Sequence, residues 1–126
     1  MASEQVIVIP MKPQSWNVLV RKHYRVVQKF KDDWREATWA AIASTHVKRV
    51  SEYPVSLLIH ASWKFKKRHD IDSLATKFCV DSLVEFGVLV DDDTTHVASV
   101  TFTGAIGQAK DELRITIVPR CGTITP

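Results

Sequence analysis

Residues 55–66 carry the clearest pattern in the chain, an alternation with a period of two. Every second side chain from Val55 is apolar, while the side chains between them are more polar. The apolar set is Val55, Leu57, Ile59, Ala61, Trp63 and Phe65. Successive side chains of a strand point to opposite faces, so this pattern predicts a long strand with one buried face. The strand would deliver its basic end directly to His69 and Asp70.

The segments before this strand predict one strand and one helix. The β-branched run from Gln5 to Ile9 is ended by Pro10, which is typical of a first or edge strand. Apolar residues at helical spacing predict a helix over about residues 28–47, with acidic residues early and basic residues late. We expect Trp34 and Trp39 of that helix to be core anchors.

The segments after it predict a second helix and two strands. Asp72 or Ser73 is a suitable cap for a helix that runs to about Phe86, with Gly87 ending it. This helix is apolar on two sides, so we expect the sheet to cover one side and a partner subunit the other, at Val80 and Val84. Residues 96–102 and 113–117 are the remaining strands.

The order of elements is β-α-β-α-β-β. It predicts an α+β fold with a mixed sheet and two helices, most simply on one face. At 126 residues the chain is expected to be a single domain, residues 1–126, with a flexible tail at about 120–126.

Two basic stretches indicate a polyanionic partner. No acidic residue occurs between Met11 and Lys31, where cations alternate with aromatic residues, and this segment is expected to be a loop or arm. Basic residues mixed with aromatics are suited to DNA, although a solvated basic loop is an equal alternative. The expected DNA contacts are Arg21, Lys22, Arg25, Lys64, Lys66, Lys67 and Arg68. A formal net charge of +3 agrees with this weakly.

A dense acidic cluster follows the second basic stretch. The segment from His69 to Asp93 contains Asp70, Asp72, Asp81, Asp91, Asp92 and Asp93, out of 14 acidic residues in the chain. Asp70 and Asp72 point the same way if the chain is extended there. If residues 87–90 run back along the helix, the Asp91–Asp93 loop joins them. Carboxylate oxygens select Mg²⁺, or Mn²⁺, over zinc.

Such a cluster with Lys77 beside it would suit metal-assisted phosphodiester hydrolysis. The alternative is purely structural: a helix cap, a polar turn, and an ion pair between Lys77 and Asp81. Residue types alone leave both open.

Several other kinds of site are excluded by the sequence. An EF-hand is absent because no D-x-D-x-D-G loop with a terminal Glu occurs. The two cysteines, Cys79 and Cys121, have no zinc-site spacing, and we expect Cys79 to be a reduced core thiol. No nucleophile elbow is present. No apolar run approaches the roughly 20 residues of a membrane span, and the expected location is the cytoplasm.

The spacing of the acidic segment resembles the RusA family of Holliday-junction resolvases, which phages and prophages often carry. The matching pattern is D-x-D-[NS]-L, a lysine, D-x-L, a glycine and D-D. It falls here on Asp70, Asp72, Ser73, Leu74, Lys77, Asp81, Leu83, Gly87, Asp91 and Asp92. The early P-x-S-x-N segment (Pro13, Ser15, Asn17) is also similar to the family's N-terminal motif.

The resemblance implies a RusA-like fold, essential carboxylates at Asp70, Asp72 and Asp92, and an essential lysine at Lys77. Asp91 is a further candidate metal ligand, and Asp91 or Asp93 could substitute for Asp92. The implied protein is a Mg²⁺-dependent homodimer that resolves four-way DNA junctions by paired symmetric nicks, in a bacterial cell and of phage or prophage origin. The alternative is a non-catalytic module that binds junction or duplex DNA, with a structural acidic cluster.

Two departures from the family pattern bear on this expectation. Ser73 stands where the family usually has Asn, and serine also caps helices. Lys77 lies five residues after Asp72, where the founding member has four. One extra residue turns a helical position by about 100°. The spacing from Lys77 to Asp81 and Gly87 is kept, so we place the extra residue at the helix start.

Overall fold

The computed structural model describes residues 4–71 and 74–119. Within them the chain forms an α+β fold with a four-stranded mixed sheet and three helices. The elements are β1 (Gln5–Ile9), α1 (Trp16–Leu19), α2 (Tyr24–Thr45), β2 (Val55–Ser62), α3 (Lys77–Glu85), β3 (Val97–Ala105) and β4 (Glu112–Pro119). The expected α+β class and mixed sheet are confirmed, with the short α1 as an addition.

The strands are ordered β1-β4-β2-β3 across the sheet. β4 pairs antiparallel with both β1 and β2, whereas β2 and β3 are parallel. A parallel pair needs a crossover connection, and α3 lies within the one that joins β2 to β3. β3 therefore forms one edge of the sheet, and β1 forms the other.

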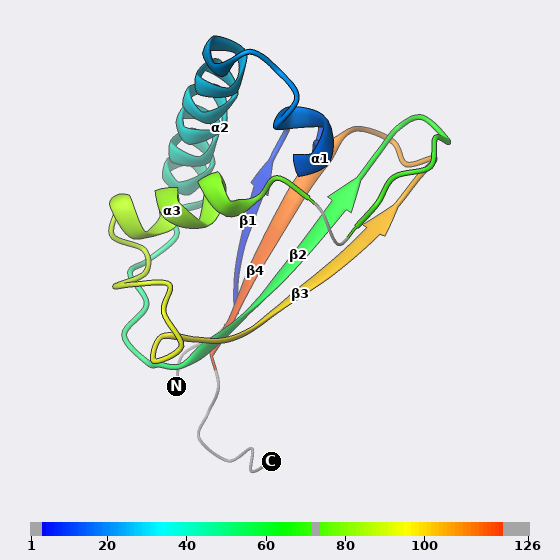
Figure 1. Ribbon diagram of the computed structural model, residues 1–126. Coiled ribbons are helices and arrows are strands. Elements are labelled where there is room, and N and C mark those ends of the chain that lie inside the picture. Colours follow the sequence, from blue (N-terminus) through cyan, green and yellow to red (C-terminus); the bar gives the residue numbers. More distant parts are fainter. Residues whose placement is uncertain (1–3, 72–73, 120–126) are drawn as a thin grey trace.

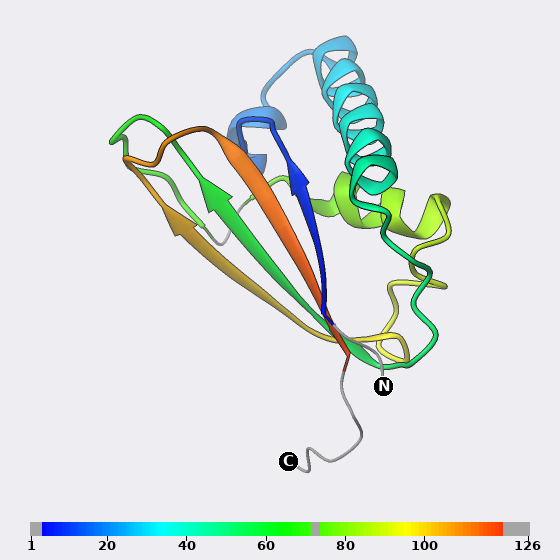
Figure 2. The ribbon, with the colours of Figure 1, turned by 180° about the vertical axis from the view of Figure 1, so that it is seen from behind.

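Helices α2 and α3 lie on the same face of the sheet, as expected (Figures 1 and 2). The core between them combines the inward-facing residues of the strands with the apolar sides of the two helices. Fully buried members include Ile7, Ile9, Trp34, Leu57, Ile59, Cys79, Leu83, Leu89, Leu113, Ile115 and Ile117. No helix within the described ranges has the length and apolar character to cross a membrane.

The period-two pattern of β2 is confirmed as far as Trp63. Val55, Leu57, Ile59 and Ala61 are all buried. The paired residues of both ladders end at Ser62, opposite Ala105 and Glu112. Trp63 makes the last backbone hydrogen bonds: its N–H donates to the Ala105 carbonyl, and its carbonyl accepts from the Gln108 N–H, both at 2.9 Å. Beyond this point nothing requires alternation, and the expected inward position of Phe65 is wrong: its side chain is 67% exposed.

The segment from Met11 to Lys31 is not the loop or arm that we expected. Ser15 caps α1, its Oγ accepting a hydrogen bond from the Asn17 N–H at 3.2 Å. α2 then begins at Tyr24, with His23 as its N-cap and the His23 Nδ1 accepting from the Arg25 N–H at 3.2 Å. The first turn of α2 lacks acidic residues, so its start lacks the usual electrostatic signature.

α3 is shorter than expected and begins at Lys77, with Thr76 as its N-cap. A cap at Asp72 or Ser73 is therefore wrong for this helix, and both residues lie outside the described ranges. α3 also packs against α2. The Arg35 guanidinium donates two hydrogen bonds, of 2.8 and 2.6 Å, to the Glu85 carboxylate.

Trp39 of α2 contacts the end of α3, and it is not the core anchor that we expected. Its ring lies 5.4 Å from that of Phe86, and the residue stays 54% exposed. Trp34, by contrast, is buried as expected. The two tryptophans lie five positions apart on α2, which places them on different faces of the helix.

Candidate functional site

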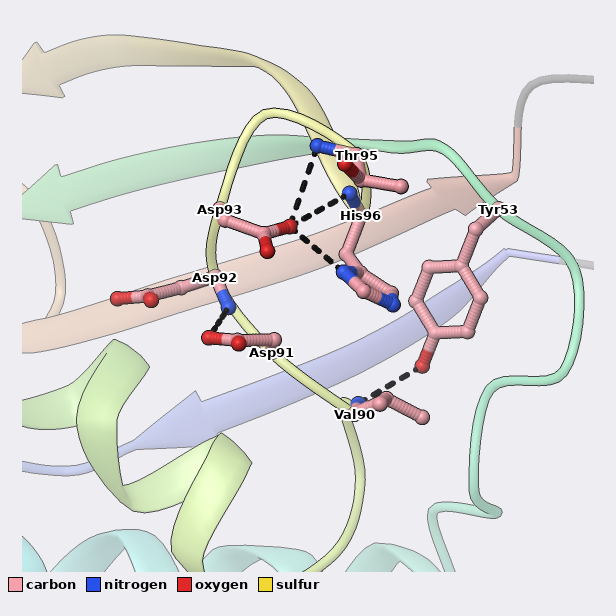
Figure 3. A network of polar contacts seen from close by, with 7 residues as sticks. All are labelled: Tyr53, Val90, Asp91, Asp92, Asp93, Thr95 and His96. Carbon is pink, nitrogen blue, oxygen red and sulfur yellow. Dashed lines mark hydrogen bonds and ion pairs between the residues drawn. The ribbon is translucent and has the colours of Figure 1, made fainter.

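The three aspartates that follow α3 have different structural roles (Figure 3). Asp93 organises the turn: its Oδ1 accepts from the N–H groups of Thr95 and His96 at 3.1 and 3.2 Å and lies 2.6 Å from the His96 Nδ1. The hydrogen bond from His96 lowers the pKa of Asp93. The Asp91 Oδ1 accepts from the Asp92 N–H at 2.7 Å. Asp91 and Asp93 thus support the backbone of the turn.

Asp92 projects away from this turn, in the opposite direction to Asp93 (Figure 3). Its Oδ2 lies 3.8 Å from the Lys77 Nζ, and the same ammonium donates to the Asp81 Oδ1 at 3.3 Å. The expected pair between Lys77 and Asp81 is therefore present, but it does not occupy Lys77 alone. Lys77 bridges a carboxylate of its own helix and one from the turn.

The chain does run back along α3, as the closure of the site requires. α3 has nine residues, a length of about 13 Å, and Lys77 lies at its start while Asp92 comes after its end. Gly87 makes the reversal with a φ of +79°, a conformation that favours glycine. The N–H groups of Val88 and Leu89 then both bond to the Leu83 carbonyl.

The returning segment is fixed at its far end by Tyr53. The Tyr53 hydroxyl accepts from the Val90 N–H and donates to the Val50 carbonyl, both at 3.0 Å. Its ring meets that of His96 edge-on, with 4.8 Å between centroids. The backbone on both sides of Asp92 is therefore held in place before any ligand binds.

Lys77 and Asp92 line a hollow of about 360 Å³ between α3 and the sheet. Its floor is apolar and comes from β2 and β3. The lining residues are Leu57, Ile59, Leu74, Thr76, Lys77, Val80, Asp92, Val97, Val100 and Phe102.

Asp70 lies on the segment that leads from the end of β2 towards this hollow. Its side chain is exposed, and no hydrogen bond or ion pair to another described residue holds its carboxylate. The next residue, Ile71, packs over Gly104 of β3, where an added Cβ would lie 3.3 Å from the Ile71 side chain. Asp72, two positions further on, lies outside the described residues.

The N-terminal motif residues support this same segment from the other side. The Ala75 N–H donates to the Gln14 carbonyl at 2.8 Å, and Ser15 and Leu74 form an isolated β-bridge. Pro13 accepts a hydrogen bond at 3.1 Å from the indole nitrogen of Trp63. The Pro13–Asn17 stretch therefore fixes the chain on both sides of the Asp70–Ser73 segment.

Within residues 4–71 and 74–119, no three His, Cys, Asp or Glu side chains form a group that could hold a metal ion. Asp92 is the member of the acidic turn that lines the hollow, and Lys77 is its one charged partner in the described part of the chain. Its oxygen donors suit Mg²⁺ or Mn²⁺, and Asp70 and Asp72 precede the same hollow in the chain.

The expected DNA-binding residues fall in two places, both towards the end of the sheet to which β2 and β3 point (Figures 1 and 2). Arg21 and Lys22 lie in the turn between α1 and α2, and Arg25 lies in the first turn of α2. The other four, Lys64, Lys66, Lys67 and Arg68, form an exposed loop after β2. Among the ion pairs of residues 4–71 and 74–119, none involves these seven side chains.

Sequence reasoning missed Lys12, Phe65 and Asp111, which meet beside this loop. They line a second, smaller hollow together with Trp63, Lys67 and His69. The pKa of His69 is lowered by burial and by the neighbouring ammonium groups of Lys12 and Lys67. These residues are far apart in sequence, and the acid-free basic run that contains Lys12 was the one signal that pointed to part of the group.

The sequence was also compared with known proteins. It matches no model of a protein family and no curated protein.

Proposed function

We propose that this protein is a Mg²⁺-dependent endonuclease that acts on branched DNA and resolves four-way junctions by paired symmetric nicks. The observation that carries the proposal is the approach of Lys77 to Asp92, 3.8 Å apart at the mouth of a hollow that follows the Asp70 segment. A purely structural turn would not need its middle aspartate to face a lysine from the start of a helix. The RusA-like spacing of these residues supports the same assignment.

The chain's own residues would divide the work as follows. Asp70, Asp72 and Asp92 would hold the cation, with Asp91 and Asp93 fixing the turn that presents Asp92. Lys77 would balance negative charge that develops on the phosphate, as a lysine does in many phosphoryl-transfer sites. A bound Mg²⁺ supplies Lewis-acid stabilisation of that charge and activates the attacking water.

The extra residue between Asp72 and Lys77, compared with the founding member, is compatible with this role. α3 begins at Lys77 itself, so the additional residue precedes the helix and does not rotate Lys77 around it. The distance from Lys77 to Asp92 is then set by the return of the chain through Gly87.

Two copies of the chain would place one site on each of two opposed DNA strands. β3 is an edge strand that carries exposed Val100 and Phe102 and has no charged residue. Edge strands without charges tend to pair with another strand. Val80 is the part of the expected Val80 and Val84 surface that lies beside this edge, in the same hollow.

Cleavage of a synthetic four-way junction tests the proposal. We expect paired nicks with Mg²⁺, no nicks with EDTA, and none on a linear duplex. Asp70→Asn should abolish cleavage and retain junction binding, and so should Asp72→Asn. The matched control is Asp33→Asn, which removes an exposed carboxylate that pairs with Lys29 on α2, at 3.1 Å. Persistent cleavage by Asp70→Asn would refute the site.

Replacing Lys66 and Lys67 together by alanine tests the DNA-binding surface. We expect weaker binding to every DNA and a salt-dependence slope that is smaller by about two. If junction binding is tight but no divalent ion supports cleavage, the protein is the non-catalytic DNA-binding module, and the acidic turn is structural. Cleavage of flaps without symmetric cuts would instead indicate a more general structure-specific nuclease.

A further inference from the structure

Phe65 is an exposed aromatic ring in the middle of a basic loop. Its side chain is 67% exposed, although phenylalanine is usually buried. The four cations of residues 64–68 surround it in sequence, and no acidic residue lies among them. An exposed ring set among cations is the composition of surfaces that stack on bases while holding phosphates.

The fold imposes this exposure, because both ends of the loop are fixed. Trp63 is 2% exposed, and its indole N–H donates to the Pro13 carbonyl at 3.1 Å. Its ring stacks on His69, with 4.0 Å between centroids and 3° between planes. The stacked pair brackets the loop, so the positions between them have little freedom to bring Phe65 inward.

The loop is also held from the β3–β4 connection. The Lys64 N–H donates to the Asp111 carboxylate at 2.8 Å. The side chain of Lys66 lies over Gly107, where an added Cβ would be 3.1 Å from it. A preorganised loop loses little conformational entropy when it binds a ligand, which favours a binding role over a loose surface loop.

A small hollow of about 100 Å³ lies beside the Phe65 ring, with Lys12 and Lys67 in its lining. Asp111 lines the same hollow, and its carboxylate accepts the hydrogen bond from the Lys64 N–H. The ammonium groups of Lys12 and Lys67 supply the positive charge at the hollow and can reach a phosphate next to a stacked base.

We propose that Phe65 stacks on an unpaired base of DNA, and that Lys12 and Lys67 hold the phosphate next to that base. Bases within a duplex are already stacked on their neighbours, so only an unpaired base at a branch point or in a single strand offers a free face. The inference rests on DNA being the ligand of the proposed function, but not on cleavage. It assigns the preference for branched over linear DNA to this loop.

Binding measured by fluorescence anisotropy in EDTA tests the inference without interference from cleavage. The probes are a four-way junction, a single-stranded oligonucleotide and a linear duplex. We expect Phe65→Ala to weaken binding of the first two by roughly 5- to 150-fold, the scale of one lost base stack. Duplex affinity and the salt slope should not change, because no phosphate contact is removed. Phe65→Tyr should bind like the original protein.

Trp39→Ala is the matched control, since it removes another exposed aromatic ring, on α2, where we propose no DNA contact. Unchanged junction affinity for Phe65→Ala, or an equal loss on linear duplex, would overturn the inference. If binding depends on Phe65 but the protein never cleaves DNA, the proposed enzyme activity is refuted and this inference stands. If the Phe65→Ala protein binds junctions with unchanged affinity and cleaves them normally, this inference is refuted and the enzyme activity stands.

Discussion

Asp92→Asn separates the catalytic from the structural role of the acidic turn. The change keeps the shape of the side chain and removes its charge. Asp92 is 36% exposed and Lys77 is 75% exposed, with 3.8 Å between their charged atoms. An exposed ion pair of this kind contributes at most about 1 kcal/mol to the free energy of unfolding. For a domain of this size we therefore expect a melting temperature within about 5 °C of the original protein.

The effect on activity should be much larger than the effect on stability. Losing one group that stabilises transition-state charge typically costs on the order of 100-fold or more in rate. The same change should abolish stabilisation by Mg²⁺. At a Mg²⁺ concentration ten times its Kd, binding adds about 1.4 kcal/mol to the stability of the original protein. Junction cleavage and melting temperature with and without Mg²⁺ measure both effects.

Asp81→Asn is the matched control for this prediction. Asp81 is the other carboxylate that pairs with Lys77, at 3.3 Å, and it does not line the hollow. Its replacement removes a comparable ion pair, so the melting temperature should shift by a similar small amount. Cleavage and the Mg²⁺ effect should remain. The reasoning fails if Asp92→Asn cleaves within tenfold of the original protein, or if Asp81→Asn loses as much activity as Asp92→Asn.

Three further predictions concern the scaffold. The hydrogen bond from Arg35 lowers the pKa of Glu85 from its usual 4.5. The pair therefore stabilises the folded protein above pH 4.5, and this contribution is lost as the pH falls through the lowered pKa. Acid unfolding should therefore be less steep for Glu85→Gln; an unchanged curve would contradict this. Gly104→Ala should press on the buried Trp63 ring, 3.1 Å from the added Cβ, and on Ile71, 3.3 Å from it. It should therefore lower both the melting temperature and cleavage, and an unchanged melting curve would contradict this. Burial raises the pKa of Cys79 to about 12. In a Cys121→Ser protein, Cys79 should therefore react with a thiol reagent only on unfolding, and rapid labelling of the folded protein at pH 8 would refute this.

The sequence predicted the strands well, because a period of two is a local property that burial enforces. β2 shows the limit of this kind of prediction. The strand ends where its partner strands end, and no residue near Phe65 indicates that position. The predicted start of α2, at about residue 28, was too late, because the acidic residues Asp32, Asp33 and Glu36 indicated a beginning close to them. The actual first turn is basic, and His23 caps it with a ring nitrogen.

The candidate site was predicted as a set of residues but not as an arrangement. Three consecutive aspartates are equivalent in sequence, and only the turn decides which one faces Lys77. That decision depends on Gly87 at a positive φ and on the Tyr53 hydroxyl holding Val90, contacts that join segments more than 30 residues apart. The helix cap at Asp72 or Ser73 was wrong for the same reason, because pairing with Gln14 and Ser15 keeps residues 74 and 75 out of the helix.

The position of β4 in the sheet has a consequence for synthesis on the ribosome. β4 is the last described strand in the chain, yet it lies between β1 and β2 and pairs with both. Until the residues up to Pro119 have left the exit tunnel, β1 has no strand to join, and the inward face of β2 is only partly enclosed. During this time the nascent chain has unpaired strand edges, and chaperones can bind a chain in that state. A stop codon within β4 would leave two unjoined parts of a sheet rather than a slightly shortened protein.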